Sequence, residues 1–195
     1  MTVMSGAFFE QMVAAAVQDP PDALLDDPAI VWLDWKEEPE DIVHELGTRS
    51  AGVAVVAELL DEGETSELVL RRGDRREAVR LDADSAGGHF DRCVRAVARL
   101  LGPEESVRLV VASNGSDTLG FVVASAERWR ALRERFGPEL DRRFCPVDVL
   151  PDLMDTPGDQ IEAAIAAYAG VAPPVADAER SSRRRRWWRR WFGGG

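Results

Sequence analysis

The chain has little cysteine, almost no lysine and no long hydrophobic run. Its two cysteines, Cys93 and Cys145, are too few for a disulfide framework and lack the close spacing of a zinc site. No stretch reaches the roughly 18 uncharged apolar residues of a membrane-spanning helix. Residues 1–11 contain no lysine or arginine, so the charged start of a signal peptide is missing. These absences predict a soluble, cytoplasmic protein.

The motifs of several enzyme classes are also missing. No G-x-G-x-x-G or G-x-x-x-x-G-K-[ST] run offers a nucleotide-binding loop, and no G-x-S-x-G run offers a nucleophilic serine. His89 and Asp91 are too few ligands for a metal, and Cys93 falls on the apolar face of a helix, where packing is its simplest role. We therefore expect no cofactor, no metal and no catalytic residue.

The composition predicts one folded domain with two appendages. Hydrophobic residues make up 45% of the 195, which is ordinary for a globular protein. Residues 1–170 form the expected domain, residues 171–182 have the Pro, Ala and Ser content of a linker, and residues 183–195 form a basic tail.

Apolar periodicity and turn residues predict an α+β fold. Helices are expected from Ser5 to the Pro20-Pro21 stop, from Pro39 to Gly47, around 90–101, after the cap Ser125, and from the cap Thr156 to Gly170. Strands are expected at 29–33, 53–60, 67–71, 77–81, 107–112 and 119–124, although 51–60 also suits a helix. Short turns between strands indicate a mostly antiparallel sheet of about six strands, with helices packed on one side.

Two segments carry a family resemblance. The run from Leu33 to Ile42 (LDWKEEPEDI) and the run from Ser116 to Val122 (SDTLGFV) resemble signatures of a family of small bacterial α+β domains, domain of unknown function 6630. The resemblance spans about residues 5–145 and implies a fold but no activity. The second run has Leu119 where the family has an aromatic residue.

The most specific candidate site in the domain surrounds the chain's one lysine. Lys36 stands beside Asp34 and Trp35 at the end of a predicted strand, and Asp117 follows from the loop before another strand. A compact ammonium kept in a chain of 23 arginines suits an anchoring role in ligand binding. The competing interpretation is that Asp34 and Lys36 pair with neighbouring charges while Trp35 packs.

Acidic and basic residues are unevenly distributed along the chain. Residues 1–179 hold 17 basic and all 35 acidic residues, a net charge of −18, whereas the tail is purely basic. As a helix, the tail would have an aromatic face and an arginine face. It comprises Arg183, Arg184, Arg185, Arg186, Trp187, Trp188, Arg189, Arg190, Trp191 and Phe192. An anionic membrane surface, docking onto the acidic domain or a protein partner, and single-stranded nucleic acid all suit this composition.

These observations favour a non-enzymatic protein-binding module, tethered to the inner membrane surface or self-docked by its tail. One alternative is a small enzyme that uses carboxylates and Lys36 in a cleft at the strand ends. Another is a nucleic-acid-associated accessory protein, which the acidic domain disfavours because it repels phosphates.

Overall fold

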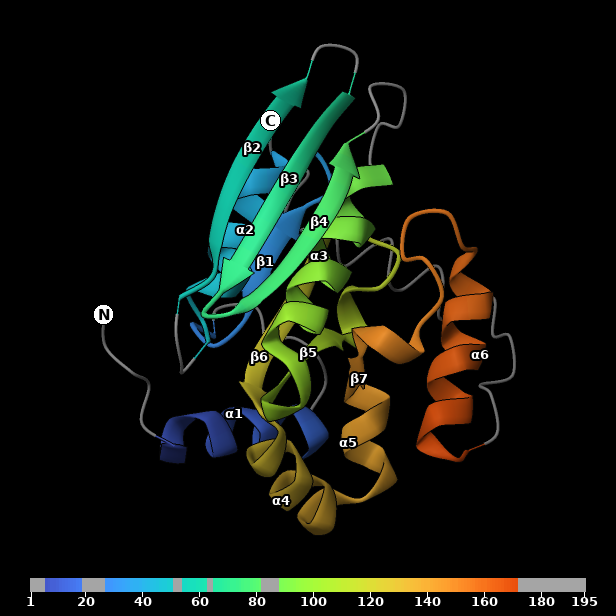
Figure 1. Cartoon of the computed structure of the whole chain (residues 1–195). Coiled ribbons are helices and arrows are strands. Elements are labelled where there is room, and N and C mark those ends of the chain that lie inside the picture. The colour runs from blue at the N-terminus through green and yellow to red at the C-terminus, as the bar shows by residue number, and fades with distance from the viewer. Residues whose placement is uncertain (1–5, 19–26, 51–53, 63–64, 82–87, 172–195) are drawn as a thin grey trace, which may run out of the picture.

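The computed structural model describes residues 6–18, 27–50, 54–62, 65–81 and 88–171. Over these ranges the chain is an α+β fold, as the sequence predicted (Figure 1). The helices are α1 (Gly6–Gln18), α2 (Pro39–Gly47), α3 (Gly88–Leu101), α4 (Ala126–Phe136), α5 (Pro138–Arg143) and α6 (Gly158–Ala169). The strands are β1 (Val31–Asp34), β2 (Val56–Glu62), β3 (Thr65–Arg72), β4 (Arg75–Leu81), β5 (Glu105–Val110), β6 (Thr118–Ser125) and β7 (Phe144–Pro146).

The strands form two sheets, so the expectation of one sheet of about six strands was wrong. Sheet A has the order β1-β6-β5-β7 and sheet B the order β2-β3-β4, and every neighbouring pair is antiparallel. The helices α2 and α3 lie between the two sheets (Figure 1). The broad apolar arc of α3 allows it to cover both sheets, because its buried apolar residues are Phe90, Cys93, Val94, Ala96, Val97, Leu100 and Leu101.

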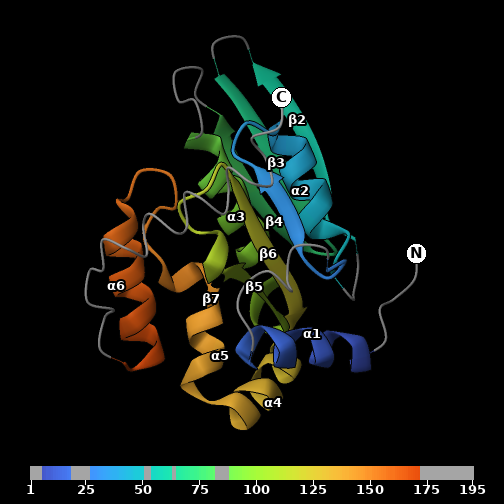
Figure 2. The ribbon, with the colours of Figure 1, turned by 180° about the vertical axis from the view of Figure 1, so that it is seen from behind.

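Sheet A is covered on both faces, each by its own hydrophobic cluster. The cluster toward α2 and α3 also includes residues of sheet B and of α6. The second cluster joins the opposite face of sheet A to α1, α4 and α5, which lie at the base of the sheet in Figure 2. Helices therefore cover both faces of sheet A, whereas in sheet B the described helices cover one face alone.

Two arginines of the β3–β4 hairpin fix sheet B to the C-terminal end of α3. Arg72 donates to the carbonyl of Leu101 at 2.9 Å and pairs with the buried carboxylate of Glu105. Arg75 donates to the same carbonyl at 3.0 Å. The last carbonyls of a helix lack partners within it and carry partial negative charge, so guanidinium groups suit them. Sheet B is thereby held with its inner face on α3.

Several local predictions can be compared with the structure. Ser125 caps α4 by accepting a hydrogen bond from the backbone N–H of Arg128 at 3.2 Å, as expected. Thr156 does not cap α6, whose N-cap is Pro157 and has no side-chain hydrogen bond. The short elements α5 and β7 were missed because six and three residues are too few to reveal a period.

Candidate functional site

The structure brings the predicted site residues into one turn beside the ends of β1 and β6. Asp34 ends β1 opposite Thr118, and its carboxylate accepts a hydrogen bond from the backbone N–H of Lys36 at 2.9 Å. The backbone N–H of Trp35 lies 3.4 Å from the carbonyl of Asp117. The ammonium of Lys36 stands 4.9 Å from the ring centroid of Trp35. The carboxylate of Asp34 is thus part of the turn itself, as its i to i+2 bond shows.

The same turn contains a carboxyl group with a raised pKa. Burial is the largest cause that raises the pKa of Glu37 above its ordinary value, and the nearby charge of Asp34 adds to it. A backbone hydrogen bond from Asp34 acts in the opposite direction. His89 lies 3.1 Å from the carbonyl oxygen of Glu37 through Nε2, which joins this turn to α3. These contacts tie the turn together.

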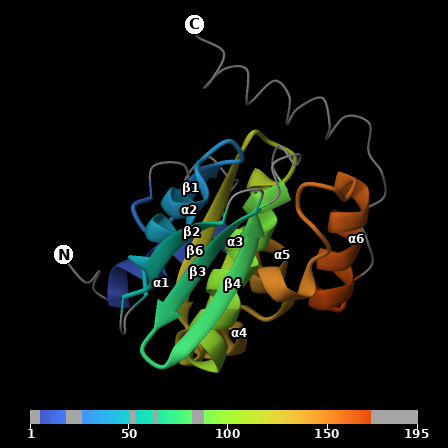
Figure 3. The same ribbon diagram turned by 45° about the horizontal axis from the view of Figure 1, so that its top comes forward.

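A second arrangement, missed from the sequence, lies on the outer face of sheet B. The register places three rows of side chains across the strands on the face turned away from α3, which Figure 3 shows with no described helix in front of it. The rows are Leu60, Glu67 and Arg80; then Glu58, Val69 and Ala78; then Val56, Arg71 and Arg76. Val69, at the centre of the face, is buried.

Strand β2 gives this face an apolar edge. Within the described residues, four large hydrophobic side chains are exposed, and three of them lie on β2: Val56 at 59%, Leu59 at 46% and Leu60 at 36%. Val56 and Leu60 point to the outer face. Leu59 points to the inner face but is still exposed. Clustered exposed hydrophobic residues mark interaction surfaces more often than scattered ones do.

Three arginines give the face a local positive charge in an acidic protein. Arg71, Arg76 and Arg80 are exposed, and none makes a hydrogen bond or ion pair with another described residue. By contrast, Glu77 points to the inner side of the sheet and pairs with Arg99 at 3.0 Å. Arg71 and Arg76 lie directly opposite each other, which is unfavourable unless an anionic group neutralises them.

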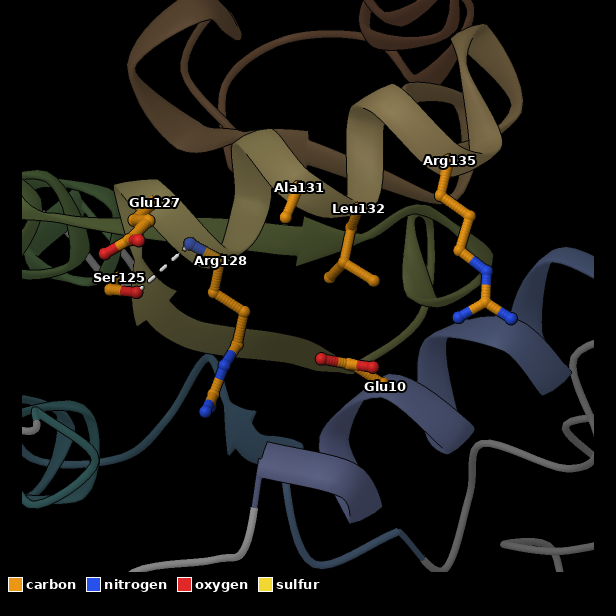
Figure 4. A pocket seen from close by; sticks show the side chains of 7 residues that line it. All are labelled: Glu10, Ser125, Glu127, Arg128, Ala131, Leu132 and Arg135. Atoms are coloured by element: carbon orange, nitrogen blue, oxygen red, sulfur yellow. Dashed lines mark hydrogen bonds between the residues drawn. The ribbon is translucent and has the colours of Figure 1, made fainter.

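A groove of about 450 Å³ lies between α1 and α4 (Figure 4). Arg128 and Arg135 extend from α4 toward α1, with Ala131 and Leu132 between them. The guanidinium of Arg128 stacks 5.2 Å from the ring centroid of Phe9. Two carboxylates, Glu10 and Glu127, also line the groove, so its charges balance and favour no class of ligand.

Beneath the groove, α4 and α5 enclose a buried ion pair. Arg108 donates to the carboxylate of Asp141 at 3.1 Å and lies 4.4 Å from the ring centroid of Trp129. Nε of Arg133 lies 2.9 Å from the second carboxylate oxygen of Asp141 and forms an ion pair with it. The direction of the N–H does not meet the criteria of a hydrogen bond. Trp129 is buried, and Phe136 is half-buried. Arg108 and Asp141 are both buried, at 6% and 0% exposure.

The thiols are structural. Burial raises the pKa of Cys93 to about 12 and that of Cys145 to about 12, so both stay protonated near neutral pH. Cys93 is buried in the apolar cluster of α3, as its position on the helix predicted. Among the described residues no group of three or more potential ligands could hold a metal ion, and no helix is long and apolar enough to cross a membrane.

One sequence signal could have found the outer face of sheet B. Residues 71–80 contain five arginines in a chain whose first 179 residues carry a net charge of −18. Strand alternation separates Arg72 and Arg75, which hold α3, from Arg71, Arg76 and Arg80, which face outward. The Arg/Trp tail, residues 183–195, lies outside the described residues.

Comparisons with models of protein families, with curated proteins and with solved structures found no match to this chain. The resemblance carried by residues 33–42 and 116–122 therefore stays a prediction.

Proposed function

We propose that the chain is a non-enzymatic protein-binding module whose binding surface is the outer face and the β2 edge of sheet B. The observation that carries this proposal is the exposure of Val56, Leu59 and Leu60 on one edge strand. Exposed apolar side chains on a strand beside a free edge are the features that extended protein segments use when they bind to sheets.

The charges on the face favour an acidic partner. Arg71 and Arg76 lie opposite each other, whereas Arg80 lies opposite Glu67, and a partner carboxylate would relieve the repulsion between Arg71 and Arg76. Glu58 and Glu67 lie on the same face, which favours a protein with charges of both signs over a uniformly anionic lipid surface. The partner we expect is an extended segment that is mainly acidic, carries some basic residues and has alternating apolar residues.

Selection from a displayed library of random peptides tests this proposal. We expect peptides selected on the intact chain to be rich in Asp and Glu and to lose binding to the triple variant Arg71→Glu, Arg76→Glu and Arg80→Glu. The control changes Arg130, Arg135 and Arg142 on α4 and α5 to Glu; it alters the net charge equally and also removes the pair of Arg142 with Glu139. Selected peptides that bind both triple variants alike would contradict the proposal.

We further propose that the tail tethers the module to the inner membrane surface. Its arginines suit anionic headgroups, each contributing about 1 kcal/mol near a charged surface, and its tryptophans suit the interface. Flotation with anionic vesicles tests the tether: the intact chain should float and the chain without residues 183–195 should not. Equal flotation would leave docking of the tail onto the acidic domain as the interpretation to test. The alternative of an enzyme that uses Asp34, Lys36 and Asp117 stays a hypothesis.

A further inference from the structure

The β3–β4 hairpin carries two arginines that no other described residue binds. Arg71 and Arg76 lie directly opposite each other on the outer face, and both side chains are exposed. Side chains in such a pair start from Cβ atoms about 4.5–5.5 Å apart, so their guanidinium groups can reach the same ligand. In the neighbouring row, Glu58 lies diagonally to Arg71 and forms no ion pair with it. The pair therefore keeps its charge and its hydrogen-bond donors for a ligand from outside.

The inner arginines of the same hairpin fix the backbone behind this pair. Arg72 pairs with Glu105 and donates to the carbonyl of Leu101 at 2.9 Å. Arg75 binds both carboxylate oxygens of Glu104, each at 2.9 Å. These contacts hold the end of the hairpin against the end of α3. A ligand of the outer pair thus meets a backbone that is already ordered, which lowers the entropy that binding costs.

We propose that Arg71 and Arg76 together bind one phosphoryl group, carried by a phosphorylated serine or threonine of the partner segment. This inference rests on the proposed function, because it takes the outer face of sheet B as the binding surface and names the chemical group recognised there. A phosphate monoester has a charge of about −1.5 to −2 at pH 7 and three strong acceptor oxygens. A carboxylate has one negative charge and two oxygens. The phosphoryl group therefore neutralises the whole pair, whereas a carboxylate neutralises half of it.

The surroundings of the pair favour a protein segment over a lipid headgroup as the source of the phosphate. Val56 completes the row with 59% exposure, so an apolar side chain of the partner can pack beside the phosphate. Glu58 would repel the neighbouring headgroups of an anionic membrane, whereas it attracts a basic residue of a segment. Arg80 lies outside the site, because it is opposite Glu67 and about 13 Å along β4 from Arg76. The expected ligand combines a phosphoryl group, an apolar residue and a basic residue.

Peptides with a fixed phosphoserine test the site. The probe is a library of short synthetic peptides with phosphoserine at the centre and random residues around it, from which binders are selected on the intact chain. Each selected peptide is then made in three forms, with phosphoserine, glutamate or serine at the centre, and its affinity is measured by fluorescence polarisation. We expect the phosphoserine form to bind at least about tenfold more tightly than the glutamate form, with the serine form the weakest.

Two double variants locate the effect on the chain. Arg71→Gln with Arg76→Gln should bind the phosphoserine form about tenfold more weakly than the intact chain does. It should fold at least as stably, because it removes like charges that lie opposite each other. The control, Arg80→Gln with Arg130→Gln, changes the net charge equally at two other exposed positions and should keep the affinity. Every variant retains the basic tail, so a difference between variants reports the outer face.

The pH dependence separates a phosphoryl group from a carboxylate. The second pKa of a phosphate monoester is about 6, so the group loses one charge below this pH. Between about pH 7.5 and about pH 5.5, the phosphoserine form should weaken about two- to fourfold relative to the glutamate form. The titratable groups of the face, Glu58 and Glu67, are present for both peptides, and the two histidines belong to α2 and α3. An equal response of both peptides would contradict the inference.

The outcomes separate this inference from the proposed function. Phosphoserine and glutamate forms that bind alike, both through Arg71 and Arg76, would overturn the phosphoryl site and leave an acidic segment as the partner. Peptides that bind without any dependence on the outer face would overturn both. Flotation with phosphoinositide vesicles is the last arm. Stronger flotation of the intact chain than of the variant Arg71→Gln with Arg76→Gln would assign the pair to a lipid headgroup and overturn the inference, whereas equal flotation supports a protein source.

Discussion

Arg71 lies directly opposite Arg76 on the outer face of the β3–β4 hairpin. Like charges in this position destabilise an antiparallel pair, and no described carboxylate neutralises them. The arrangement is expected to cost stability, and it leaves two exposed guanidinium donors side by side.

Replacing Arg76 by Glu should therefore stabilise the fold while weakening the proposed binding. The new carboxylate would face Arg71 as a cross-strand pair, with a gain of about 0.5–1 kcal/mol in the free energy of unfolding by urea. The same variant should bind the selected acidic peptides more weakly. Arg130→Glu, on exposed α4 surface, should change neither measurement. A destabilised Arg76→Glu variant would mean that Arg76 has a structural role on this face.

Gly102 should be harder to replace than Gly73, although both have positive φ, +67° and +58°. A Cβ on Gly102 would meet the guanidinium of Arg75, whereas nothing lies within 4 Å of a Cβ on Gly73. Gly102→Ala should therefore lose the Arg75 bonds to the end of α3 as well as the backbone freedom. We expect it to cost about 1 kcal/mol more than Gly73→Ala in urea unfolding. Equal costs would show that Arg75 moves aside without loss.

The buried pair of Arg108 and Asp141 should be sensitive to the loss of one partner. Asp141→Leu leaves the guanidinium of Arg108 buried beside Trp129, so we expect a loss of about 3–5 kcal/mol in unfolding free energy. The double change with Arg108→Met should recover much of this loss, because it removes both buried charges. If the double variant is as unstable as the single one, the stability at this place comes from packing rather than from charge.

The pH dependence of Glu37→Gln follows from the raised pKa of Glu37. A carboxyl whose pKa is higher in the folded state stabilises the protein fully below its unfolded pKa of 4.5. This contribution to the free energy of unfolding is lost as the pH rises through the folded pKa. Glu37→Gln should therefore melt at a higher temperature than the native chain at neutral pH. The difference should vanish below about pH 4.5, where Glu37 is protonated in both states. The control Glu38→Gln changes an exposed neighbour. A difference that persists in acid would assign the gain to packing.

Local elements could be predicted because their signals are local. Pro39 and Gly47 bound α2 as the sequence indicated, and the strand pattern around 67–71 and 77–81 predicted the meander of sheet B. The separation into two sheets could not be predicted in this way. It depends on β1 pairing with β6, far along the chain, and on α3 serving two sheets.

The candidate surface was missed for the same reason. An apolar run such as that containing Val56 and Leu60 looks the same in the centre of a sheet and at its edge. Strand order alone reveals that these residues are exposed, and strand order depends on contacts between distant segments. The turn with Asp34 and Lys36 was predictable because it directly follows a strand.

Site-specific photo-crosslinking tests the central claim, that the outer face of sheet B binds protein, most directly. A photoreactive residue in place of Leu60 should give a discrete adduct in the cells that produce the chain, whereas one in place of Val149 should not. The mass of the adduct separates a second copy from a different protein. Changing Arg71, Arg76 and Arg80 to Glu should abolish the adduct with a different protein. Equal adducts from Leu60 and Val149, or none from Leu60, would contradict the account.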